Sequence, residues 1–345
     1  MCWGLRIMSE PQNPQQIIER LIAVKLNGKL ITCERVLLGY FGYVYKVEAV
    51  LRDKRETLAV KLNDVFIDQT EEERINNRVY GTAYEDFKSV RNTYGLIVKA
   101  GIPIFKLYSF GFPAKDISYI YQIMSWIEGE SIQEYLGWGP EQGDEAHALA
   151  GEIFGKLHGI TRAYDGVTIQ KEPYLMNWKD AFFFSLHSRL NNAIKRPNEF
   201  LRSKKDIIES FISSAESGWQ DPKEFVLTHT DGLQGMVKFE NNRWIFTGVV
   251  DIEDHRFHDQ RFVLAGYELQ SVYNGREVPR VFWEAYQKSK AIDSSYYSLR
   301  SLFWLYYILS WFDIPYTDLW RGEEKDKEKI IHKNEELIKK IISAS

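Results

Sequence analysis

The chain has 345 residues, of which 44% are hydrophobic and 27% charged, the proportions of a globular protein with one large or two ordinary domains. Its net charge of −4 argues against nucleic acid as the main partner. Cys2 and Cys33 make no disulfide framework. No stretch reaches the roughly 18 uncharged apolar residues of a membrane span, and the N-terminus lacks the apolar segment of a secretory signal. We therefore expect a cytoplasmic protein without a membrane partner.

The first part of the chain is predicted to form a helix and then apolar strands. Asn13-Pro14 starts the helix, because asparagine is a favoured cap and proline is tolerated in the first turn. Strands are expected at 30–38 and 58–62.

Two features of these strands indicate a nucleotide. Gly39 and Gly42, in a turn before Tyr43, would let backbone amides approach phosphates closely, although the glycines alone also fit a plain hairpin. Lys61 lies inside an otherwise apolar strand, where a charge is costly unless it meets an anion. Nucleotide phosphates would supply that anion, so Lys61 strengthens the nucleotide interpretation.

The segment 70–100 is charged and is predicted to be helical. We expect it to carry the acid that pairs with Lys61, and Glu85 is the first choice. Asp86 is the alternative acid. A third interpretation is a solvated helix face that pairs with nothing.

The segment 161–224 is long and precedes the most polar motif of the chain. It is predicted to contain two helices, at 178–194 and 206–215. The first helix carries a run of aromatic residues, Phe182, Phe183 and Phe184. These rings would either line a pocket or fill the core between the two helices, and the core is the favoured interpretation.

Two aspartates follow apolar runs near the middle of the chain. Asp231 stands in a polar loop after 225–227, Asp251 ends the run 246–250, and a polar turn lies at 240–242. The pattern predicts strand, loop, short strand, turn and strand, with a carboxylate at each end of a hairpin. Both carboxylates would lie at the same edge of a small sheet. One could receive a proton from a hydroxyl while the other holds a divalent metal, as phosphoryl transfer requires.

These motifs resemble the aminoglycoside phosphotransferase and choline kinase family, the small-molecule branch of the protein-kinase-like fold. The family's His-x-Asp and its later metal-binding aspartate match His229-Thr230-Asp231 and Asp251. Asp259 and Leu264-Ala265 match a later family segment in part. Three positions depart from the family pattern: Met236 in the asparagine place, His258 in a glycine place and Val263 in an aspartate place.

The resemblance implies an α+β, two-lobed fold. The N-terminal nucleotide-binding lobe, residues 1–124, would be an antiparallel sheet plus helix. The C-terminal catalytic and acceptor-binding lobe, residues 125–345, would be mainly helical with small hairpins. Residues 161–224 would form a helical insertion that caps the acceptor site.

The resemblance also implies roles for individual residues. Asp231 would orient the acceptor hydroxyl and accept its proton, and Asp251 would hold Mg²⁺. Glu253 and Glu268 would meet a cationic group of the acceptor. The expected nucleotide-binding residues are Gly39, Gly42, Tyr43, Lys61, Glu85, Ser125 and Ile127, of which Ser125 and Ile127 would use backbone groups to bind the purine.

The predicted function is transfer of the γ-phosphate of ATP or GTP to a hydroxyl of a small, cationic acceptor such as an antibiotic. Met236 supports an alternative, a catalytically silent nucleotide-binding regulatory module, because a thioether is a weak ligand for Mg²⁺. A protein kinase is disfavoured, because no Asp-Phe-Gly and Ala-Pro-Glu activation segment follows Asp251.

Overall fold

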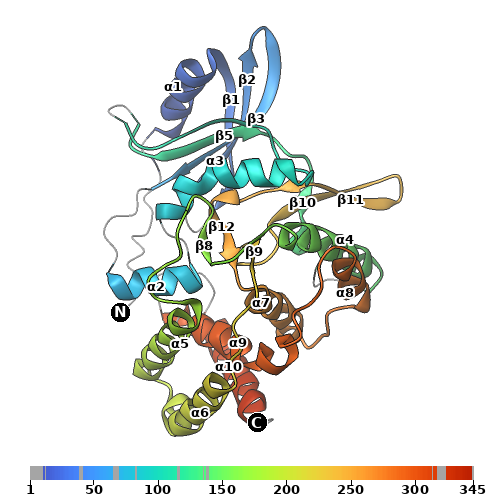
Figure 1. Cartoon of the computed structure of the whole chain (residues 1–345). Coiled ribbons are helices and arrows are strands. Elements are labelled where there is room, and N and C mark those ends of the chain that lie inside the picture. Colours follow the sequence, from blue (N-terminus) through green and yellow to red (C-terminus); the bar gives the residue numbers. More distant parts are fainter. Residues whose placement is uncertain are drawn as a thin grey trace.

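The computed structural model describes residues 11, 13–38, 42–64, 70–81, 84–114, 117–134, 136, 140–312, 314–316 and 324–343. Figure 1 shows a small N-terminal sheet above a larger, mostly helical part that also holds short strands. The expected α+β fold is thus confirmed. Among the described residues, no helix is long and apolar enough to cross a bilayer.

Five antiparallel strands form the N-terminal sheet in the order β1-β2-β3-β5-β4. They are β1 (Gly28–Leu38), β2 (Tyr43–Leu51), β3 (Lys54–Asn63), β4 (Leu107–Gly111) and β5 (Ile120–Ser125). Burial alternates along most of β2, since successive side chains point to opposite faces. Helix α1 (Pro14–Leu26) packs its apolar residues against the buried residues of the sheet.

The charged segment 70–100 forms two helices rather than one. Helix α2 (Glu71–Val79) begins with a capping box in which Thr70 and Glu73 exchange hydrogen bonds. It ends where Tyr80 takes an extended conformation, with φ −157° and ψ 103°. Helix α3 (Tyr84–Lys99) then lies beneath the sheet, whereas α2 lies beside α5 (Trp178–Lys195) of the helical part (Figure 1).

Two small sheets carry the loops that contain Asp231 and Asp251. Their strand orders are β7-β9-β12-β8 and β11-β10-β6. The strands are β6 (Glu130–Ser131), β7 (Thr161–Arg162), β8 (Gly166–Val167), β9 (Phe225–His229), β10 (Gly235–Glu240), β11 (Arg243–Val249) and β12 (His255–His258). Asn241 and Asn242 form the β10–β11 turn, and both have positive φ, as a two-residue type I′ hairpin turn requires. The two aspartates follow β9 and β11, as the sequence pattern predicts. These strands belong to different sheets, so the expected shared edge of one small sheet is wrong.

The remaining helices surround an aromatic core. They are α4 (Pro140–His158), α6 (Glu199–Ser217), α7 (Gln260–Tyr273), α8 (Arg280–Gln287), α9 (Tyr296–Phe312) and α10 (Glu324–Ser343). Phe182 of α5 stacks on Tyr306 of α9, with ring centroids 5.5 Å apart. Phe182 and Phe183 thus fill the core, the favoured interpretation, whereas Phe184 is 42% exposed.

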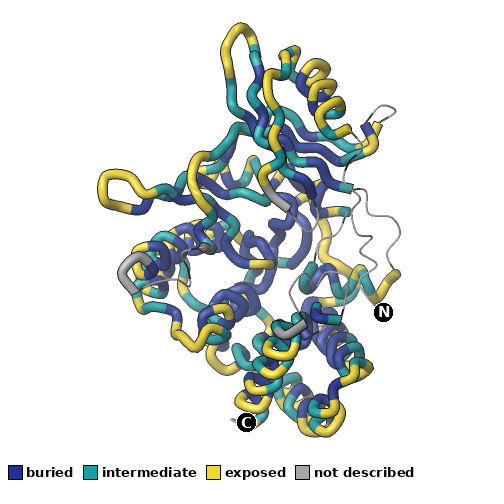
Figure 2. Tube along the Cα trace, turned by 180° about the vertical axis from the view of Figure 1, so that it is seen from behind, coloured by how far each residue is buried: buried dark blue, intermediate teal, exposed yellow. Residues whose placement is uncertain are grey.

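Apolar packing divides the described residues into two clusters. The smaller cluster links α1 with the N-terminal sheet. The larger one joins Phe87, Phe105 and Ile120 to the C-terminal helices. Figure 2 shows this buried interior, with exposed residues at the tips of the β2–β3 and β10–β11 hairpins. Part of the chain before residue 124 therefore shares the larger core, and the lobe boundary at 124 stays a prediction.

Candidate active site

Lys61 of β3 has two carboxylate partners. Its ammonium group contacts Asp251, which follows β11, and Glu253, in a short 3₁₀ helix (Ile252–Asp254). The lysine side chain is only 14% exposed, which explains its need for anions. Asp251 has φ 57° and ψ 48°, a left-handed conformation that is uncommon outside glycine and that clusters at functional sites. The structure thus brings together the predicted phosphate lysine and the predicted metal aspartate.

These three groups shift one another's pKa. Burial lowers the pKa of Lys61, but the charges of Asp251 and Glu253 raise it to a net value above its ordinary one. Burial raises the pKa of Asp251, but Lys61 and His229 together lower it to a net value below its ordinary one. For Glu253, burial and the charge of Asp251 outweigh Lys61, so its pKa is raised. At neutral pH, Lys61 and Asp251 therefore form a charged pair.

Neither acid at the start of α3 is the partner of Lys61. Glu85 is exposed, and its carboxylate lies 3.6 Å from the ammonium of Lys88 on the same helix. Asp86 is fully buried and pairs with Arg256 of β12. Because α3 packs against β12 and the short 3₁₀ helix, the buried carboxylate of Asp86 reaches Arg256. The expected Lys61–Glu85 pair is therefore wrong.

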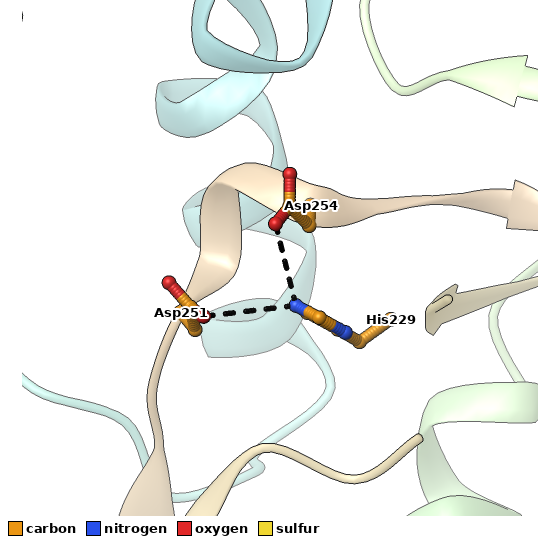
Figure 3. Close-up of side chains that lie close together, drawn as sticks. All are labelled: His229, Asp251 and Asp254. Atoms are coloured by element: carbon orange, nitrogen blue, oxygen red, sulfur yellow. Dashed lines mark ion pairs between the residues drawn. The ribbon is translucent and has the colours of Figure 1, made fainter. Parts of the chain in front are cut away.

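His229 connects the two aspartate loops. Its Nδ1 atom accepts the backbone N–H of Asp231 at 3.0 Å. Its Nε2 atom lies 3.9 Å from a carboxylate oxygen of Asp251 and 3.7 Å from one of Asp254, as Figure 3 shows. Burial lowers the pKa of His229, so the ring is neutral at pH 7. A neutral ring that accepts at Nδ1 carries its proton at Nε2, which therefore points toward the two acids.

The same tautomer limits how the site can hold a metal. His229, Asp251 and Asp254 are the group of described side chains close enough together to share an ion, with ligand atoms within 4.8 Å of one another. A protonated Nε2 has no lone pair for an ion. Burial, reinforced by the charges of Asp251 and Asp86, raises the pKa of Asp254 well above its ordinary value. Within this group the Asp251 side chain is the most exposed, at 36%, and its role as a metal ligand stays a prediction.

Asp231 stands exposed in a tight turn after β9. The N–H of Gly232, whose φ is 90°, donates to the carbonyl of His229 at 3.2 Å and closes the turn. The Tyr80 side chain, at the end of α2, lies beside the Asp231 carboxylate. Burial, and then the charge of Asp231, raises the pKa of Tyr80 well above its ordinary value, so the phenol stays protonated. No sequence motif marked Tyr80; its neighbour Gly81 signals only the end of a helix.

The predicted phosphate loop is described in part. Gly39 lies outside the described residues. At Gly42, a Cβ atom would come within 2.1 Å of the Asn63 side-chain oxygen and 3.1 Å of Lys61 Cε. Tyr43 begins β2 and is buried. Glycine at position 42 therefore permits the close approach of this segment to Lys61.

The segment expected to bind the purine follows β5. The backbone N–H of Ser125 donates to the carbonyl of Lys106 at 2.9 Å, and the N–H of Trp126 donates to that of Thr57 at 3.1 Å. The Ser125 hydroxyl oxygen accepts the N–H of Lys106 at 2.9 Å. These bonds fix the end of the strand and occupy the N–H groups of Ser125 and Trp126. The backbone groups predicted to bind the purine are therefore the Ser125 carbonyl and the Ile127 N–H.

The two acids expected to meet a cationic acceptor already have partners. Glu253 is buried and contacts Lys61. Glu268 of α7 accepts the Tyr296 hydroxyl at 2.6 Å and lies 3.2 Å from the Arg300 guanidinium. Because both carboxylates have partners within the protein, the geometry gives no support to either as a site for an acceptor amine.

Met236 lies in β10, opposite Gly248 of β11 and Ser131 of β6, with its side chain half-buried. It does not belong to the group of His229, Asp251 and Asp254. The asparagine place of the family is thus occupied by a side chain that offers no oxygen.

The fold and the site together define a class of protein. The strand order of the N-terminal sheet, a lysine on β3, a His-x-Asp turn after β9 and an aspartate after β11 are the parts of a protein-kinase-like fold. Only a short 3₁₀ helix and strand β12 separate Asp251 from α7, as in the branch that acts on small molecules.

Residues 59–262, more than half of the chain, match the sequence model of the phosphotransferase enzyme family. The chain belongs to this family, and it is a nucleotide-dependent small-molecule kinase by class. The match includes Lys61, Asp231 and Asp251. Among curated proteins, none matches the sequence.

Solved structures share the fold at low identity. A thermostable mutant of aminoglycoside phosphotransferase APH(4)-Ia, in a ternary complex with ADP and hygromycin B, is 14% identical; the match covers 95% of this chain and 98% of that one, with a TM-score of 0.57. Spectinomycin phosphotransferase APH(9)-Ia, in complex with ADP and spectinomycin, is 12% identical over 97% and 98%, with a TM-score of 0.54. Wild-type aminoglycoside 2′-phosphotransferase-IIIa, in its GDP complex, is 13% identical over 96% and 99%, with a TM-score of 0.53.

Proposed function

We propose that the protein transfers the γ-phosphate of ATP or GTP to a hydroxyl of a small acceptor, with Asp231 as the residue that receives the hydroxyl proton. The arrangement around His229 carries this proposal. One edge of the ring accepts the N–H of Asp231 and the other faces Asp251 at 3.9 Å, so the ring lies between the two loops. Phosphoryl transfer requires two such carboxylates side by side.

The phosphates would be held by Lys61 and by backbone amides at Gly42 and Tyr43. In the structure, Asp251 and Glu253 supply the negative charge around Lys61. A polyphosphate is a stronger anion than either carboxylate and competes for the same ammonium group. The purine would bond to the Ser125 carbonyl and the Ile127 N–H.

Mg²⁺ is the metal that the donor set fits. Mg²⁺ in proteins takes one or two carboxylates together with substrate phosphates and water. Asp251 would hold it through a hard oxygen, whereas the protonated Nε2 of His229 and the thioether of Met236 would not. When bound, the ion neutralises negative charge on the phosphates.

In the chemical step, a bond forms between the acceptor oxygen and the γ-phosphorus. The bond between that phosphorus and the oxygen it shares with the β-phosphate breaks, and a nucleoside diphosphate leaves. Asp231 orients the hydroxyl and accepts its proton, while Lys61 stabilises the charge on the phosphate oxygens. Most of this catalysis comes from holding the reacting groups in position, so the loop that carries Asp231 must be rigid.

For the acceptor we propose a small cationic molecule, with antibiotics among the candidates. Support comes from the family, and from related structures whose complexes contain hygromycin B or spectinomycin. Tyr80 and Trp311, both half-buried, offer aromatic surface near Asp231 that suits a cation. A reducing, cytoplasmic location would fit the free thiol of Cys33.

The test is transfer of labelled γ-phosphate from ATP, and separately from GTP, to a panel of aminated and macrolide antibiotics, choline and sugars. A labelled product that requires Asp231, judged with Asp231→Ala, supports the proposal and identifies the acceptor. Met236 supports a second candidate, a silent nucleotide-binding module. That function would give measurable ATP binding, little dependence on Mg²⁺ and no labelled product with any acceptor.

A further inference from the structure

Tyr80 lies beside the Asp231 turn, although α3 to α6 separate the two in the sequence: its ring packs on Tyr307, which reaches Thr230, and the Asp231 carboxylate is its charged neighbour. We infer that Tyr80 is a positioning residue: its hydroxyl donates to the Asp231 carboxylate and holds it in the orientation in which it receives the acceptor proton. This inference rests on the proposed function of Asp231.

The backbone around Tyr80 is held on both sides. Arg256 of β12 donates to the carbonyls of Asn77, Arg78 and Gly81. The Nε2 atom of His258, which stands in a glycine place of the family, lies 2.8 Å from the Val79 carbonyl. The N–H of Tyr80 itself donates to Asn76 at 2.8 Å. Strand β12, which pairs with β9, therefore fixes the end of α2 relative to the Asp231 turn.

The Tyr80 ring is held as firmly as its backbone. It packs edge-on against Tyr307 of α9, with ring centroids 5.2 Å apart. The Tyr307 hydroxyl in turn lies 3.5 Å from the carbonyl of Thr230, the residue before Asp231. Tyr307 thus packs against one side of the Tyr80 ring and also contacts the turn that carries Asp231.

The groups around the Tyr80 hydroxyl decide what it can do. They are Asp231 from the loop after β9, Tyr307 and Trp311 from α9, and Arg189 from α5. The phenol stays protonated at working pH, so it acts as a donor and does not compete with Asp231 as a base. A donor bond of this kind stabilises the ionised carboxylate and removes rotational freedom from its side chain.

Tyr80→Phe removes the hydroxyl and keeps the ring packing. We expect kcat to fall about ten- to a hundredfold, with no change in the KM for nucleotide. Tyr306→Phe is the matched control: its buried hydroxyl bonds to Ser185 at 2.7 Å, within the same aromatic core. A Tyr80→Phe enzyme that keeps the kcat of the control, or that loses nucleotide affinity together with kcat, would overturn the inference.

A stability cycle tests the contact without turnover. In the wild-type background, Tyr80→Phe should lower the urea midpoint. In the Asp231→Ala background the hydroxyl has already lost its acceptor, so the same change should leave the midpoint unchanged or raise it. An equal loss in both backgrounds would refute the hydrogen bond. A wild-type chain that transfers no phosphate would instead overturn the catalytic role of Tyr80 together with the proposed function.

Discussion

Lys61 and Asp251 form an ion pair that connects strand β3 of the N-terminal sheet to the loop after β11. The lysine expected to hold phosphate and the aspartate expected to hold metal thus neutralise one another. A nucleotide with its metal ion would separate this pair and give each member a new partner. The free energy needed to separate this ion pair therefore reduces the affinity for nucleotide.

Lys61→Ala should raise the KM for nucleotide and also destabilise the protein. Removing the lysine leaves Asp251 and the buried Glu253 without their cation. The loss of unfolding free energy should be smaller than the about 3–5 kcal/mol of a fully buried pair, because the Asp251 side chain is partly exposed. Urea unfolding and ATP titration calorimetry measure the two effects. Lys88→Ala, in an exposed pair with Glu85, is the control and should change neither quantity measurably.

The requirement for Mg²⁺ should depend on Asp251 and not on His229. Asp251→Asn weakens an oxygen ligand, so the Mg²⁺ concentration for half-maximal activity should rise by about tenfold or more. His229→Leu should lower kcat by about 10- to 100-fold, because the Asp231 N–H loses its acceptor, but should leave the Mg²⁺ requirement unchanged. A Mg²⁺ requirement that rises equally in both variants would show that the histidine is a ligand.

Met236→Asn should lower the Mg²⁺ concentration needed for half-maximal activity. The change puts an oxygen ligand in the place where the family carries asparagine. Met236→Leu is the control, since it keeps the volume and the apolar character of the side chain. The same Mg²⁺ response in both variants would mean that position 236 does not reach the metal.

Stability should fall as the pH drops below the ordinary histidine pKa. Burial lowers the pKa of His158 to about 3, so between that value and 6.5 the unfolded chain binds a proton that the folded protein excludes. This group alone should remove about 2 kcal/mol of unfolding free energy between neutral pH and pH 5. His158→Gln should reduce this loss in urea titrations, whereas His332→Gln, at an exposed position on α10, should not. Identical pH slopes for both variants would contradict this assignment.

Glu268→Gln should leave the KM for the acceptor unchanged. Its carboxylate is used by Tyr296 and Arg300, so an acceptor amine has no free charge to meet there. The expected cost is about 1 kcal/mol of stability from the weakened hydrogen bonds. Steady-state kinetics with the acceptor found by labelled transfer would check this. If Glu268→Gln raised the KM for the acceptor but not the KM for nucleotide, Glu268 would be part of the acceptor site.

The sequence was sufficient for the parts of the site that lie at strand ends. Apolar runs followed by a carboxylate predicted that Asp231 and Asp251 stand just after strands, and a charged residue in an apolar strand predicted that Lys61 meets an anion. These two predictions hold because local burial determines them. The shared sheet edge was wrong because the pairing of β9 with β12 depends on residues far apart in the chain.

The sequence was insufficient for contacts that depend on packing between segments far apart in the chain. Nothing in the sequence around Glu85 and Asp86 indicated that Asp86 would be buried and would pair with Arg256. Tyr80 reaches Asp231 only because α2 leaves the sheet and packs against α5. Neither contact leaves a local pattern, since each depends on elements far apart in the chain.

The most direct measurement compares γ-phosphate transfer by the wild type and Asp231→Asn at saturating nucleotide and acceptor. The isosteric amide keeps the turn but cannot accept the hydroxyl proton. We expect kcat to fall by about 10²- to 10⁴-fold, with the Kd for nucleotide unchanged. An Asp231→Asn enzyme that keeps the wild-type kcat would contradict the role of Asp231 and with it the proposed reaction.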